Sequence, residues 1–171
     1  MNASLSQKLD RLARNVVPAL FGVILVLFST IPFYIPGYAP TASNLVLMAV
    51  FYWSVHRPDL LSPVTILCIG LLQDILIGMP PGMNAVLLLL VRGVAVSQNR
   101  VFRGRSFLVL WWGFGLVAIA GAFVIWSLST AYYLTFINPL PALFQAAMTT
   151  AMFPFFAGIF TWMQIKLLSQ V

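Results

Sequence analysis

The sequence predicts an all-α integral membrane protein with about six transmembrane helices, and three observations support this fold class. Of its 171 residues, 61% are hydrophobic and 7% are charged, and the mean hydropathy is +1.00. Soluble domains carry about 25% charged residues, so these charges are too few to solvate a water-facing surface. The apolar residues form runs that approach the length of about 20 residues needed to cross a bilayer. The basic residues lie mostly between these runs. This composition argues against a soluble enzyme, a disordered chain or a nucleic-acid-binding domain.

Residues 1–15 are expected to form a cytoplasmic amphipathic segment that lies on the membrane surface. Ser4 and Gln7 have the spacing of a helix capping box. Apolar residues recur every three or four positions on one face, while Lys8, Arg11 and Arg14 occupy the other side. A frayed terminus is the alternative interpretation of this segment.

Six apolar segments follow and are expected to form one polytopic membrane domain over residues 16–171. The spans are predicted at Val16–Ile35, Thr41–Val55, Leu60–Met79, Met83–Ser97, Phe107–Tyr132 and Pro141–Leu168. The second and fourth segments are short, and partly re-entrant segments are the alternative for both. The first segment is interpreted as a retained span, because no small-residue cleavage site follows it. Pro154 predicts a kink in the last span, since it leaves the Thr150 carbonyl without its helical donor.

The charge of the connections predicts the orientation of these spans. Eight of the nine Lys and Arg residues fall before span 1, between spans 2 and 3, between spans 4 and 5, or near the C-terminus. The three other connections, near Pro36–Pro40, Pro80–Gly82 and Thr135–Leu140, carry no charge. Positive residues favour the cytoplasmic side, so both termini are predicted to be cytoplasmic. Tyr and Trp residues near the segment ends, including Tyr52 and Trp53, are expected to lie at the membrane interfaces.

Asp74 and Arg92 are the two ionisable residues that lie well inside the predicted spans. Burying a charge in hydrocarbon costs at least about 2.5–3.5 kcal/mol, which favours a partner, a water-filled cavity or a neutral form. An ion pair between Asp74 and Arg92 across the hairpin of spans 3 and 4 is within reach of the long arginine side chain. Three interpretations remain open for these residues: a pair that sets helix register, a contact with a partner helix, and a proton or substrate path.

Gly70, Asp74 and Gly78 are spaced by four residues and are expected to share one helix face. Two glycines beside a carboxylate would let another helix approach closely, either within this chain or from a partner. Pro80, Pro81 and Gly82 predict a tight turn after this face.

The sequence offers no motif for catalysis, metal binding or a cofactor. His56 is the only histidine, Cys68 is the only cysteine, and the chain lacks Gly-x-Ser-x-Gly and Walker-type motifs. The basic residues Arg100, Arg103 and Arg105 favour a topology signal or a contact with membrane lipids over a nucleic-acid site. The chain is therefore predicted not to be an enzyme and to bind no nucleic acid.

The chain resembles the MreD family of rod-shape-determining proteins. The resemblance rests on the stretch from Gly70 to Ala85, which reads Gly-Leu-Leu-Gln-Asp-Ile-Leu-Ile-Gly-Met-Pro-Pro-Gly-Met-Asn-Ala, and on Tyr52-Trp53 with Pro58 upstream. The Arg-rich connection followed by Trp111-Trp112-Gly113-Phe114 fits as well. The resemblance implies a helix arrangement similar to the membrane subunits of energy-coupling-factor transporters.

The same resemblance implies a function and partners. It implies a non-enzymatic, multi-pass protein of the bacterial cytoplasmic (inner) membrane that binds MreC. Through the wider complex it would act with the MreB filament and with the polymerase and transpeptidase of peptidoglycan elongation. The alternative is a substrate-binding membrane subunit of a small-molecule importer. Against that alternative, span 1 lacks the Ala-x-x-x-Ala pattern typical of those subunits.

Overall fold

The computed structural model of the chain describes residues 22–28, 44–58, 61–99 and 106–168, with side chains described up to residue 162. All regular secondary structure in these residues is helical. Residues 22–28 form a short helix, and the further helices are α2 (Leu45–His56), α3 (Pro63–Ile77), α4 (Met83–Ser97), α6 (Phe107–Tyr133) and α7 (Leu140–Leu168). The prediction of an all-α fold is therefore confirmed for the part of the chain that the structure describes.

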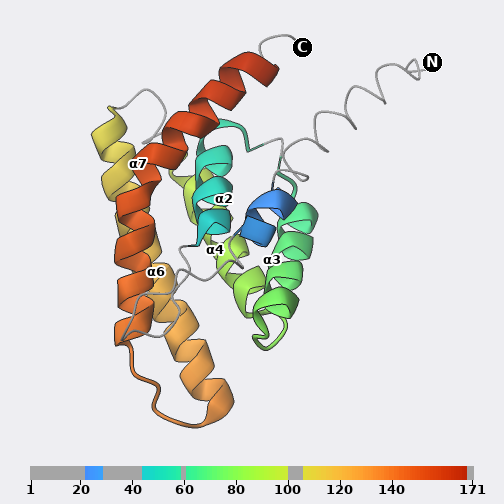
Figure 1. The fold of residues 1–171 in the computed structure, drawn as a ribbon, viewed down its shortest axis with the longest axis vertical. Coiled ribbons are helices and arrows are strands. Elements are labelled where there is room, and N and C mark those ends of the chain that lie inside the picture. The colour runs from blue at the N-terminus through green and yellow to red at the C-terminus, as the bar shows by residue number, and fades with distance from the viewer. Residues whose placement is uncertain (1–21, 29–43, 59–60, 100–105, 169–171) are drawn as a thin grey trace, which may run out of the picture.

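Two helical hairpins enclose the short central helix α2 (Figure 1). Helices α3 and α4 pack extensively against each other on one side, and α6 and α7 do so on the other. Helix α2 contacts α4, α6 and α7. Every residue of α2 from Leu45 to Val55 is buried. A helix that is apolar on all sides is suited to this central position.

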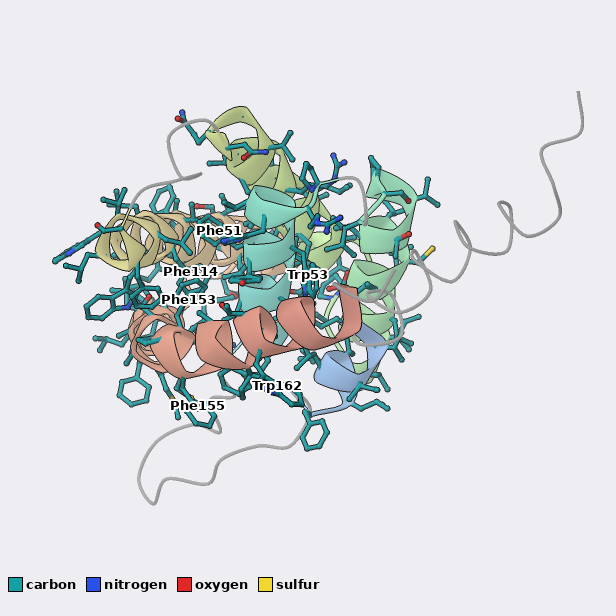
Figure 2. All side chains as sticks on the ribbon, turned by 90° about the horizontal axis from the view of Figure 1, so that it is seen from above. Phe51, Trp53, Phe114, Phe153, Phe155 and Trp162 are labelled. Atoms are coloured by element: carbon teal, nitrogen blue, oxygen red, sulfur yellow. The ribbon has the colours of Figure 1, made fainter. Side chains whose placement is uncertain are left out.

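Aromatic residues from three helices form the centre of the core. The ring of Phe114 on α6 stacks on Phe153 of α7 with a centroid distance of 4.2 Å. Phe51 of α2 lies 5.3 Å from Phe114 and 6.1 Å from Phe153. Figure 2 shows these rings pointing between the helices, whereas Phe155 and Trp162 point away from them. Such close-packed rings fix how α2 sits against the α6–α7 hairpin.

Helices α6 and α7 expose many large apolar side chains. Trp112 and Leu116 on α6 are 71% and 70% exposed, and Phe155 on α7 is 70% exposed. Phe107–Tyr133 and Leu140–Trp162 are long and apolar enough to cross a membrane. Helices α2, α3 and α4 are shorter, at 12, 15 and 15 residues. Fifteen residues extend about 23 Å, against a hydrocarbon core of about 30 Å. Six complete spans therefore stay a prediction.

The predicted positions of four helices agree with the structure to within three residues at each end. Helix α2 begins four residues inside the second segment, predicted over Thr41–Val55, and ends one residue after it, at His56. Capping hydrogen bonds mark the N-termini of two helices. Asn44 and Ser62 cap α2 and α3 by accepting hydrogen bonds from Leu47 and Thr65. The segment 1–15 and most of the predicted first span lie outside the described residues.

Tyr52 and Trp53, which were expected to lie at a membrane interface, point into the protein. Both side chains are only 2% exposed. The hydroxyl of Tyr52 is 2.8 Å from the hydroxyl of Thr161 on α7, and its ring stacks on His56. The reason is the position of α2, which is surrounded by other helices and so turns its aromatic residues into the protein.

Candidate functional site

The turn between α3 and α4 is organised by the buried carboxylate of Asp74. The side chain is 0% exposed. Its Oδ2 accepts a hydrogen bond from Gly82 N at 2.8 Å. Its Oδ1 accepts from Asn84 N and from Asn84 Nδ2, both at 2.9 Å. Three N–H donors therefore satisfy the carboxylate within its own hairpin, as a buried anion requires.

These donors lie at the N-terminus of α4, where backbone N–H groups have no helical partner. Gly82 is the cap residue of α4, with φ of 107°, and supplies no capping side chain of its own. Asp74, reaching over from α3, takes that role. The negative charge also lies at the positive end of the α4 dipole, which stabilises it further. A side chain from the preceding helix thus caps the start of α4.

The expected ion pair between Asp74 and Arg92 is not formed. Both residues are described, and Arg92 instead donates from Nε to the carbonyl oxygen of Leu61 at 3.0 Å. Leu61 lies just before the start of α3, and Asp74 lies near its end. In an antiparallel hairpin, Arg92 therefore reaches the opposite end of α3 from Asp74. The interpretation as a register-setting ion pair is corrected to two separate hydrogen-bonded contacts.

Gly70 and Gly78 have different surroundings, although they were expected to share one face. A Cβ atom on Gly70 would lie 2.7 Å from Ala85 N and also against Ala85 Cα, so α3 and α4 approach each other closely here. Gly78 lies beyond the last residue of α3, as its cap, with φ of 74°. A Cβ on Gly78 would meet nothing within 4 Å. Gly78 thus ends the helix and does not extend the Gly70 face.

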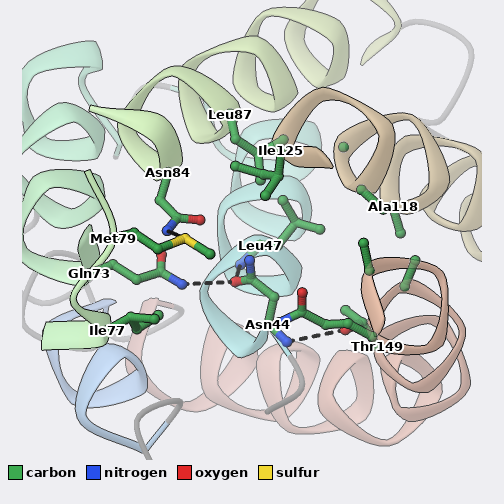
Figure 3. Close-up of a pocket in the computed structure, with 15 residues that line it drawn as sticks. Asn44, Leu47, Gln73, Ile77, Met79, Asn84, Leu87, Ala118, Ile125 and Thr149 are labelled. Atoms are coloured by element: carbon green, nitrogen blue, oxygen red, sulfur yellow. Dashed lines mark hydrogen bonds between the residues drawn. The ribbon is translucent and has the colours of Figure 1, made fainter. Parts of the chain in front are cut away.

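A small cavity with a partly polar lining lies beside this turn, between α2, α3, α4, α6 and α7 (Figure 3). Its volume is about 80 Å³. Its polar lining residues are Asn44, Gln73, Asn84, Gln145 and Thr149, and its small lining residues include Ala118, Gly121, Ala122 and Ala146. Gln73 Nε2 donates to Asn44 Oδ1 at 3.3 Å, and Asn44 N donates to Thr149 Oγ1 at 3.1 Å. These bonds link α2 to α3 and to α7.

No sequence pattern predicted this cavity. Its polar residues are uncharged and are scattered over four segments, so no spacing pattern connects them. The available signal was the presence of amide side chains within or beside apolar segments, where each needs a hydrogen-bonding partner.

A side-chain contact between α6 and α7 compensates for Pro154. The Trp111 indole Nε1 donates to Thr150 O at 2.9 Å. Thr150 is the residue whose carbonyl loses its donor because proline has no N–H. The Thr150 Cγ2 methyl group also lies 3.2 Å from where a Cβ on Gly115 would be. The sequence predicted the unpaired carbonyl, and the structure supplies its donor from the neighbouring helix.

The described residues contain no group of three or more His, Cys, Asp or Glu side chains that could hold a metal ion. His56 Nδ1 lies 3.0 Å from Tyr52 O, and Cys68 is exposed with no disulfide. The buried polar groups near the α3–α4 turn form hydrogen bonds that join helices. Their arrangement is that of a packed helical framework around a small, partly polar cavity.

These features define an all-helical membrane protein, because two long apolar helices expose large hydrophobic side chains around a buried, hydrogen-bonded interior. The family model of the rod shape-determining protein MreD matches residues 10–170, nearly the whole chain. The chain therefore belongs to the MreD family, which has a role in determining rod shape. No curated protein and no solved structure matches the chain.

Proposed function

We propose that the chain is a non-enzymatic scaffold subunit of the bacterial cell-elongation complex. In this role it binds MreC directly and supports lateral peptidoglycan synthesis. The chain acts with MreB and with the elongation polymerase and transpeptidase indirectly, through the wider complex. The observation that carries this proposal is the MreD family match over residues 10–170.

The arrangement of the α3–α4 hairpin supports a structural role for the candidate residues. Asp74 and Gly82 are joined by a hydrogen bond in the turn, Gly70 packs against Ala85, and Arg92 holds the start of α3. We propose that this hairpin is a packing unit that presents its outer surface to partners. Gly78 at its exposed end is the candidate partner contact.

We further propose that the protein lies in the cytoplasmic membrane as a multi-pass protein with both termini in the cytoplasm. The uncharged connections at Pro80–Gly82 and Thr135–Leu140 then face outward. The α3–α4 turn and the α6–α7 turn lie at the same end of the molecule, which supports this common orientation (Figure 1).

Depletion of the protein from rod-shaped cells tests the proposal. Cells are expected to become round or swollen as lateral wall synthesis loses its membrane scaffold, and the full chain should co-purify with MreC from membranes. Expression of the wild-type chain should restore both properties. Cells that stay rod-shaped but require an added vitamin would contradict the scaffold role and favour the importer.

A further inference from the structure

The guanidinium group of Arg92 has hydrogen-bond donors that its own hairpin does not use. Its Nε donates to Leu61 O at 3.0 Å, and the N–H groups of its two Nη atoms remain. In the part of the chain that the structure describes, these Nη atoms form no hydrogen bond or ion pair. Neither of them is buried. They are therefore accessible to a molecule that approaches from outside the protein.

No acidic side chain balances this charge among the described residues. Asp74 is the only acid there, and it lies at the opposite end of the α3–α4 hairpin, where its carboxylate already accepts three hydrogen bonds. Arg57, at the C-terminus of α2, is only four positions before Leu61 and adds a second guanidinium group at the Arg92 end. Its side chain likewise forms no ion pair with a described residue. This end of the molecule therefore carries positive charge that suits an anion.

The residues around Arg92 indicate that its guanidinium group lies at the membrane surface. Leu61 and Ser62 precede α3 and are not helical, and Ser62 is exposed. Exposed non-helical backbone does not occur within the hydrocarbon region, because its polar groups would lack partners there. The guanidinium group bonds to Leu61 O and so lies at the same level. A long arginine side chain on an apolar helix typically extends to this level, which places its charge among the lipid headgroups.

Phosphate is the anion that this group fits best. The planar guanidinium fork binds two phosphate oxygens at once, through parallel N–H donors. Phosphate is also the anionic group of the phospholipid headgroups at this level. Two guanidinium groups without a described acid favour a headgroup with a net negative charge over a zwitterionic one.

We propose that the Nη atoms of Arg92 bind a phosphate group, while Nε holds the start of α3. The headgroup of an anionic phospholipid is the source that the position at the membrane surface favours, and a free phosphate ion is the other source. Arg57 adds positive charge at this end of the molecule. The proposal requires only that the chain lies in a membrane. It does not depend on MreC binding or on which end is cytoplasmic.

Native mass spectrometry of the full chain tests this site. The protein is purified in a non-ionic detergent, freed of co-purified phospholipid, and titrated separately with phosphatidylglycerol and with phosphatidylcholine. The first phosphatidylglycerol is expected to bind with a Kd at least about tenfold lower than that of the first phosphatidylcholine. Similar Kd values for the two lipids would overturn the proposal.

Two variants and a matched control connect lipid binding to Arg92. Arg92→Gln removes the charge and the fork, and it is expected to raise the Kd for the first phosphatidylglycerol at least about tenfold. Arg92→Lys keeps the charge without the fork and should raise this Kd by a smaller factor, about threefold. Ser106→Asp is the control, because it lowers the net charge by the same amount at the exposed N-cap of α6, where aspartate is well tolerated. It should raise the Kd about twofold or less.

Inorganic phosphate distinguishes the two sources of the phosphate group. It is compared with chloride at equal ionic strength. A lipid source predicts that phosphate changes neither the thermal unfolding midpoint of the lipid-free protein nor its binding of phosphatidylglycerol. A free ion as the source predicts that phosphate raises the midpoint of the wild-type protein, but not that of Arg92→Gln, and that it displaces phosphatidylglycerol.

The variants also define what would overturn the proposal. Folded Arg92→Gln protein that binds phosphatidylglycerol as tightly as wild type would do so, and so would equal weakening by Ser106→Asp. The Arg92 charge would then be assigned to water or to an acidic group of a partner protein. If Arg92→Gln does not fold, as judged by its thermal unfolding, Arg92→Lys decides by the same criterion.

Discussion

Asp74 shows how one buried charge is stabilised without a countercharge. Its carboxylate accepts three hydrogen bonds from Gly82 and Asn84, all at the N-terminus of α4. The sequence indicated that a charge in this apolar stretch needs a partner, and Arg92 was the expected one. The nearby N–H groups satisfy the charge instead, because the Pro-Pro-Gly turn brings them directly to it. Arg92 lies farther along α4 and bonds to Leu61 O.

Replacing Asp74 with Ala is expected to lower the free energy of unfolding by about 3 kcal/mol, since N–H donors of α4 lose their acceptor. Asp74→Asn keeps one acceptor oxygen and should lose less. Thermal unfolding of purified protein, followed by tryptophan fluorescence, measures both effects.

A double-mutant cycle of Asp74→Ala with Arg92→Leu tests whether these residues act separately. Because neither contacts the other, their effects should add to within about 0.5 kcal/mol. A coupling energy well above that value would indicate that Asp74 and Arg92 do form an ion pair and would contradict the two separate contacts seen in the structure.

Gly82 carries a backbone conformation that other residues rarely adopt, with φ of 107°. Gly82→Ala is therefore expected to destabilise the protein by about 1–3 kcal/mol, although an added Cβ would meet no atom within 4 Å. Gly93→Ala is the matched control, because Gly93 lies inside α4 with equally open space and no positive φ. It should be neutral or stabilising by about 0.5–1 kcal/mol. Equal effects of the two changes would contradict the backbone explanation.

At the scale of helices, close approach and a compensated proline determine how the hairpins pack. Gly70 lets α3 lie directly against Ala85 of α4. Trp111 on α6 supplies the donor that Pro154 removes from α7. Each contact joins the two helices of one hairpin. The hairpins are therefore expected to respond separately to substitutions.

Gly70→Leu is expected to separate α3 from α4 and to lower both protein abundance and thermal stability, because the side chain would overlap backbone atoms of Ala85. Gly158→Leu on α7 is the control, since a Cβ there meets nothing within 4 Å. Abundance in membranes and co-purified MreC are measured together. Normal abundance with reduced MreC would indicate that Gly70 contacts a partner and does not serve internal packing.

Trp111→Phe is expected to cost about 1–3 kcal/mol, because it leaves the half-buried Thr150 carbonyl without a donor. Pro154→Ala restores the helical N–H to that carbonyl. In the Pro154→Ala background, Trp111→Phe should therefore cost less. Unfolding midpoints of the four proteins give the coupling, and a cost that is unchanged by Pro154→Ala would show that the indole N–H does not replace the helical donor.

At the scale of the whole molecule, two hairpins surround a buried helix, and long apolar helices on one side expose their side chains. The expected orientation follows from charge, since Pro80–Gly82 and Thr135–Leu140 lack charged residues. Single cysteines in these turns, placed in a Cys68→Ser background, should react with an impermeant reagent added to intact spheroplasts. Cysteines near either terminus should react only after the membrane is opened. Cytoplasmic labelling of either turn would contradict the six-span topology.

The class of the protein and the positions of α3, α4, α6 and α7 are predictable from the sequence alone. Apolar composition and segment length depend on local residues alone, and the helix ends are marked by local signals such as Ser62-Pro63 and Gly78. The family resemblance, carried by the stretch from Gly70 to Ala85, is likewise confirmed by the match over residues 10–170.

Which polar groups bond to each other depends on how the helices pack. The burial of Tyr52 and Trp53, the use of the Asp74 carboxylate by α4, and the bond from Trp111 to Thr150 all depend on helix neighbours. The cavity beside Gln73 requires five helices to converge. Periodicity gives the face of one helix, but it does not specify which helix packs against that face. Hydrogen bonds are short and directional, so their partners become defined only when the backbones are in place.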